Sequence, residues 1–137
     1  MNRYIIQYED KRVLVNIYKT RWMMHRASLA YAKNGTIDKS THGALGVCYR
    51  WWLTPHKPNK VVSVIMMSWD TVNFEILSHE LLHAAVHLYT YDNEEDGRVV
   101  STENDEEIAT IHSDLVGPLL ELFDKEKIMK LVNNQKS

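Results

Sequence analysis

The stretch that decides the fold of this chain is FEILSHELLHAAVHL, residues 74–88. It contains neither glycine nor proline, and its apolar residues recur at helical spacing, so we predict one continuous buried helix. One side of that helix carries an apolar stripe, made of Leu77, Leu81, Ala84, Ala85 and Leu88. The opposite side carries His79 and His83, and we expect it to face away from the core.

The two histidines have the spacing of a metal site. They are four residues apart, which on a helix brings their Cβ atoms to about 5–6 Å and lets both imidazoles bind one zinc ion. Glu80 projects about 100° around the helix from His79, beside the metal, where the general base for a water molecule must stand. The alternative is a core helix whose histidines only cap a cleft through hydrogen bonds. We predict a Zn²⁺ site with His79 and His83 as ligands and Glu80 as the catalytic base.

A zinc hydrolase needs a third protein ligand and one open position for water. His87 lies on the same face, but eight residues of rigid helix separate it from His79, about 12 Å, which is too far for three rings on one ion. His112 is a further candidate. For both histidines we favour packing or a polar contact over metal binding.

Composition sets the class of protein. The 137 residues fit a single domain, 1–137, and 45% hydrophobic with 25% charged residues is typical of a globular protein. A net charge of −2 requires neither nucleic acid nor an anionic membrane. The apolar run near the N-terminus, Tyr4-Ile5-Ile6, is short, so we expect no signal peptide or membrane span there. Cys48, the only cysteine, cannot form an intrachain disulfide, so a reducing cytoplasm fits best. We expect Cys48 to be a small buried side chain in a strand.

Periodicity and turn residues predict the remaining elements. Strands are expected at residues 4–8 and 13–18, a helix at 22–32, and a hairpin from strands at 43–53 and 61–67. Asp70 or Thr71 is expected to cap the histidine-bearing helix, and residues 91–104 to form an acidic loop. A helix at 105–116 is expected to end or kink at Gly117-Pro118, followed by a last helix at 118–132.

The later helix carries a second motif, Glu106-Glu107-Ile108-Ala109. With the strand at 61–67 and the motif His79 to His83, it resembles the minigluzincins, small HExxH metallopeptidases that include ImmA/IrrE-type and phage- or mobile-element-encoded domains. The resemblance implies an α+β zincin-like fold, with a short, mainly antiparallel sheet packed against the HExxH helix and a following glutamate-bearing helix. It also implies that Glu106, three residues before Ala109, is the third zinc ligand.

The adjacent Glu107 is the alternative third ligand. On a helix Glu106 shares its face with small residues that would allow close approach to another helix, whereas Glu107 lies about 100° away beside Asp114. The small residues on the Glu106 face are Ala109, Thr110, Ser113 and Gly117. Ile108, Ile111 and Leu115 are expected to pack into the core behind them.

The resemblance implies a zinc metallopeptidase that acts on a peptide or protein substrate through metal-activated water. The strand at 61–67 would be the edge along which the substrate adds as a strand. No residue is singled out as the further oxyanion donor; the available side chains are Tyr49, Tyr89, Tyr91, His42 and His112.

Two other functions stay open. The first is a non-catalytic binding or regulatory module that keeps the metal for folding, which does not require the base Glu80. The second is a protease acting on nucleic-acid-bound proteins, suggested by Tyr49-Arg50-Trp51-Trp52 with His56, Lys57 and Lys60. A net charge of −2 makes direct nucleic-acid binding less favoured. The substrate, the host and the oligomeric state are not determined by the sequence.

Overall fold

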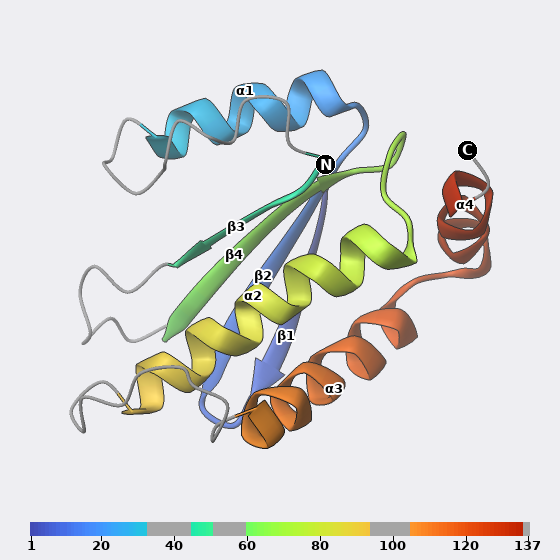
Figure 1. Cartoon of the computed structure of the whole chain (residues 1–137). Helices are drawn as coiled ribbons and strands as arrows, with labels where there is room; N and C mark the ends of the chain where they lie inside the picture. The colour runs from blue at the N-terminus through green and yellow to red at the C-terminus, as the bar shows by residue number, and fades with distance from the viewer. Residues whose placement is uncertain (33–44, 51–59, 94–104, 136–137) are drawn as a thin grey trace.

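A four-stranded mixed sheet lies at the centre of the molecule (Figure 1). The computed structural model describes residues 1–32, 45–50, 60–93 and 105–135. The strands are β1 (Asn2–Tyr8), β2 (Lys11–Tyr18), β3 (Val47–Arg50) and β4 (Val61–Ser68). Their order in the sheet is β1-β2-β4-β3, so β1 and β3 form the two edges.

Two antiparallel pairs are joined by a parallel one. The strands expected at 4–8 and 13–18 correspond to β1 and β2, which pair antiparallel. The expected hairpin pairing is confirmed between β3 and β4, although β3 is shorter than the strand predicted at 43–53. β2 and β4 run parallel in the middle of the sheet. Parallel neighbours need a long crossover connection, and the chain between these two strands includes α1 (Arg21–Ala32).

Helices cover both faces of the sheet. α1 packs on one face, where Met24 contacts Val64 and Met66 in a small apolar cluster. The other face carries α2 (Phe74–Asn93), α3 (Asp105–Leu122) and α4 (Lys125–Gln135), whose apolar residues join the larger core (Figure 1). None of the helices that the structure describes combines the length and apolar character needed to cross a membrane.

The position of β4 corrects one expectation. The proposed substrate edge, residues 61–67, is an internal strand paired with β2 on one side and β3 on the other. Ile65 and Met67 are buried towards α2, and Val64 and Met66 towards α1. A run that is apolar on both faces is typical of a central strand. The edge next to α2 is therefore β3.

The predicted cap of the histidine-bearing helix is also wrong. Asn73 caps α2, because its Oδ1 accepts a hydrogen bond from the backbone N–H of Ile76 at 2.9 Å. Asp70 instead accepts a bond from the backbone N–H of Arg21, at 3.2 Å, at the first residue of α1. A turn at Ser68, whose carbonyl accepts bonds from residues 71 and 72, separates β4 from the cap. Each helix thus begins where a side-chain oxygen satisfies a free backbone donor.

The C-terminal helices differ from the prediction as well. α3 continues through Gly117 and Pro118 to Leu122, and α4 starts only at Lys125. Leu115 and Leu119 are both fully buried on either side of the proline, so tertiary packing keeps the helix continuous despite the lost backbone donor. The break comes at Asp124, whose Oδ1 accepts a bond from the backbone N–H of Lys127 at 2.9 Å.

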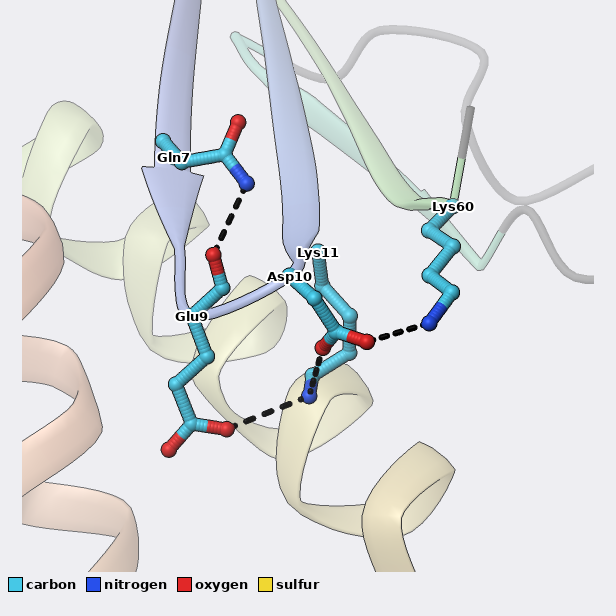
Figure 2. Close-up of polar contacts among 5 residues, drawn as sticks. All are labelled: Gln7, Glu9, Asp10, Lys11 and Lys60. Atoms are coloured by element: carbon cyan, nitrogen blue, oxygen red, sulfur yellow. Dashed lines mark hydrogen bonds and ion pairs between the residues drawn. The ribbon is translucent and has the colours of Figure 1, made fainter. Parts of the chain in front are cut away.

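The turn between β1 and β2 holds a buried charge. Lys11 is only 3% exposed, and its Nζ donates to Glu9 at 3.3 Å and to Asp10 at 3.2 Å (Figure 2). Lys60, at the start of β4, contacts the other oxygen of Asp10. Gln7 donates from its side chain to the carbonyl of Glu9 at 2.9 Å. The buried ammonium is paired, as such groups must be, and the cluster joins the β1–β2 turn to the start of β4.

Candidate metal centre

The histidines of α2 are held on its outer side by the packing of its inner side. The five predicted stripe residues are all buried in the core against the sheet: Leu77, Leu81, Ala84, Ala85 and Leu88. This burial fixes the rotation of α2 about its axis. His79 and His83 consequently lie exposed, side by side on successive turns.

The two imidazoles have the separation that a shared tetrahedral ion requires. Their Nε2 atoms are 3.2 Å apart, and the ring planes are inclined at 82°. Two nitrogens on one tetrahedral zinc ion, each at about 2.0–2.1 Å, are about 3.3 Å apart. The same 3.2 Å also suits a hydrogen bond between two neutral rings. Burial and the neighbouring His79 lower the pKa of His83, which favours the neutral, metal-binding form.

Glu80 lies beside the histidines but points inward. It is 5% exposed, and its Oε1 is 3.9 Å from His79 Nε2. Its Oε2 is buried with no hydrogen-bond partner among the described residues. Burial raises the pKa of Glu80 from 4.5 to about 7. An unsatisfied, buried carboxyl oxygen with this pKa is suited to exchange a proton with a water molecule near neutral pH.

A close approach of backbone to side chain positions Glu80. Gly46, just before β3, lies so near that an added Cβ would be 3.0 Å from Glu80 Cγ and 3.1 Å from Ile76 Cγ2. A side chain at position 46 would displace the carboxyl group. Position 46 falls inside the strand predicted at 43–53, whereas it lies just before β3 in the structure. Its contact with α2 could not be predicted, because no local pattern marks a glycine that packs against a distant helix.

His79, Glu80 and His83 form the one group of potential metal donors among the described residues, with ligand atoms within 4.8 Å of one another. Glu106 is not part of that group; it lies exposed in the first turn of α3, beside Glu107. The structure therefore brings together three of the four predicted site residues.

The packing of α3 indicates where Glu106 stands. His112 Nε2 contacts the carbonyl of Ser78 at 3.0 Å, and α2 and α3 run antiparallel (Figure 1). Six residues before His112, about 9 Å along the axis, Glu106 is thus level with the turn of α2 that carries His83. The residues predicted to pack behind it, Ile108, Ile111 and Leu115, are buried. Its role as third ligand stays a prediction.

His87 and His112 make polar contacts, as expected. His112 bonds to Ser78 on α2. His87 Nδ1 lies 2.9 Å from Ser63 Oγ and 3.7 Å from Cys48 Sγ, between α2 and the sheet. Cys48 lies in β3, and burial raises the pKa of its thiol to about 12. His87 and Cys48 therefore make structural contacts between α2 and the sheet, and neither belongs to the donor group.

Two of the five candidate oxyanion donors, Tyr49 and Tyr89, are buried. Tyr49 is buried in the cluster on the α1 side of the sheet, away from the histidines. Tyr89 is buried in the main core. A third candidate, His42, lies outside the described residues. So do four of the residues that suggested a nucleic-acid-bound substrate: Trp51, Trp52, His56 and Lys57.

A cleft of about 440 Å³ adjoins the donor group. It lies between the start of α2 and the residues that lead into β3. Its lining consists of Leu45, Gly46, Asn73, Glu75, Ile76, His79 and Glu80. A small molecule or one side chain of a peptide can therefore approach Glu80 and His79 from solvent.

Comparison of the chain with protein-family models, with curated proteins and with solved structures finds no match. The function has to be inferred from the chemistry of the site.

Proposed function

We propose that this protein is a zinc-dependent metallopeptidase that hydrolyses peptide bonds of a peptide or protein substrate. The observation that carries the proposal is the buried Glu80 Oε2, without a partner among the described residues, beside two histidine nitrogens 3.2 Å apart. A structural metal site has no need of a buried carboxyl group that is left unsatisfied, since such a group is costly. The proposal also rests on the resemblance to minigluzincins.

His79 and His83 would hold the metal, with Glu106 as third ligand. Two imidazoles and a carboxylate are a donor set that catalytic zinc uses. When bound, zinc supplies a Lewis acid that polarises the peptide carbonyl and makes water more acidic. Glu106 lies outside the donor group in this structure, so its exposed side chain would have to move towards the histidines to bind the metal.

Glu80 would move the proton. Its Oε2 accepts a proton from the attacking water as the new C–O bond forms. The same group then gives that proton to the leaving nitrogen as the C–N bond breaks. A carboxyl group beside the metal can accept the proton in the first step and donate it in the second.

The edge strand β3 would align the substrate. Among the strands that the structure describes it lies at one edge of the sheet, and Gly46, just before it, packs against Glu80. An extended peptide that adds to β3 as a further strand would bring its backbone past the donor group. Cys48 as the single cysteine fits a reducing compartment such as the cytoplasm.

Metal analysis with matched variants tests the proposal. Wild-type protein should bind about one zinc ion, His79→Ala and His83→Ala should lose it, and His25→Ala on α1 should keep it. Glu80→Gln should retain zinc but lose cleavage of a peptide mixture by orders of magnitude. Zinc binding without any Glu80-dependent cleavage would support the non-catalytic module instead. Absence of zinc binding would refute the metal site itself.

A further inference from the structure

The cleft beside Glu80 has a lining that the proposed reaction does not use. Two rows of α2 side chains reach it: Glu75 one turn before His79, and Ile76 one turn before Glu80. Leu45 forms the opposite wall. A residue next to the bond being cleaved can place its side chain in this cleft.

The walls of the cleft are apolar. Leu45 is 43% exposed, which leaves much of a large apolar side chain uncovered. Ile76 is half-buried, and Gly46 packs closely against it at the base of the cleft. An aliphatic chain lying between Leu45 and Ile76 would remove apolar surface from water.

The rim of the cleft carries a negative charge. Glu75 is exposed at its rim, and none of the described residues that line it is basic. The start of α2 contributes an opposing field, equivalent to about half a positive charge. At the rim, the full charge of the Glu75 carboxylate outweighs that half charge, so a group that reaches Glu75 is favoured when it is a cation.

We propose that this cleft binds a lysine or arginine side chain of the substrate, adjacent to the cleaved bond, and that Glu75 determines this specificity. Both side chains combine a long aliphatic stem with a terminal cation, matching apolar walls with a carboxylate at the rim. The inference rests on the proposed peptidase function for its biological meaning, but the cleft can be tested by binding alone.

Binding is measured by calorimetry on zinc-loaded protein with two probes, benzoyl-arginine hydroxamate and benzoyl-citrulline hydroxamate. The hydroxamate group anchors both probes on zinc, and citrulline is the neutral isostere of arginine. Wild-type protein should bind the arginine probe about fivefold more tightly, the effect of one exposed ion pair. Glu75→Gln should abolish the difference, and Glu75→Lys should reverse it. Glu121→Gln, the same change at an exposed site on α3, should leave it intact.

Equal affinity of wild-type protein for both probes, or a preference that survives in Glu75→Gln, overturns the inference. Failure of both probes to bind the zinc-loaded protein also overturns it. In parallel, the cleavage products of a peptide library should carry lysine or arginine next to the new ends in wild type and lose this bias in Glu75→Gln. Arginine-probe selectivity without cleavage of any peptide would refute the peptidase function while supporting the cleft.

Discussion

Replacing Glu80 by glutamine should remove a pH dependence from the stability of the metal-free protein. Burial raises the pKa of Glu80 from 4.5 to about 7, so the folded protein binds this proton more tightly than the unfolded chain does. The resulting stabilisation is fully present below about pH 4.5 and is lost as the pH rises to about 7. The difference in pKa corresponds to about 3 kcal/mol between pH 4 and pH 8.

The assay is urea unfolding of wild type and Glu80→Gln at both pH values, with a chelator present throughout. Glutamine does not titrate, so the stability of the variant relative to wild type should increase by about 3 kcal/mol from pH 4 to pH 8. Groups that titrate in both proteins cancel in this comparison, as does any pH-independent cost of the substitution. Parallel pH profiles for the two proteins would show that Glu80 is not desolvated as described, and would refute the reasoning about its proton transfer.

Three further experiments, two substitutions and one thiol reaction, test the local structure. Gly46→Ala adds a Cβ 3.0 Å from Glu80 Cγ and should destabilise the protein by about 1–2 kcal/mol in urea unfolding. Its control, Gly117→Ala, adds a Cβ with nothing within 4 Å and should be neutral or stabilising. Equal effects of the two substitutions would contradict the close contact at Gly46. The half-buried Cys48 thiol, with its pKa raised to about 12, should react with a disulfide reagent at pH 8 about 10–100-fold more slowly in folded than in unfolded protein; similar rates would contradict the raised pKa. Asn73→Ala removes the cap of α2 and should cost about 1 kcal/mol, measured by thermal unfolding; an unchanged midpoint would place the helix start elsewhere.

Sequence patterns predicted the elements where one local signal dominates. Alternation and turn residues located both strand pairs, and helical spacing located α2 with its buried and exposed sides. At Pro118 the sequence predicted an end or a kink, and the helix does not end there. The burial of Leu115 and Leu119 outweighs that local preference, and no local pattern measures how strongly two distant surfaces hold a helix together.

The pairing order of the sheet was beyond local patterns as well. The run at 61–67 was interpreted as an edge, although its apolar residues on both faces place it between β2 and β3. The sequence predicted Asp70 or Thr71 as the cap of α2, whereas the structure uses Asn73, a residue type that caps helices equally well. The turn at Ser68 decided it, and Asp70 became the partner of α1.

The sequence by itself determined which groups could carry the chemistry. The four-residue spacing of His79 and His83 is a property of any helix, so their proximity followed once residues 74–88 were recognised as helical. Only the tertiary structure decided what surrounds them. The burial of Glu80, its contact with Gly46 and the acidic cleft next to it depend on β3 packing against α2. These residues are far apart in sequence, and a pKa or a cleft arises from surroundings that residue spacing does not describe.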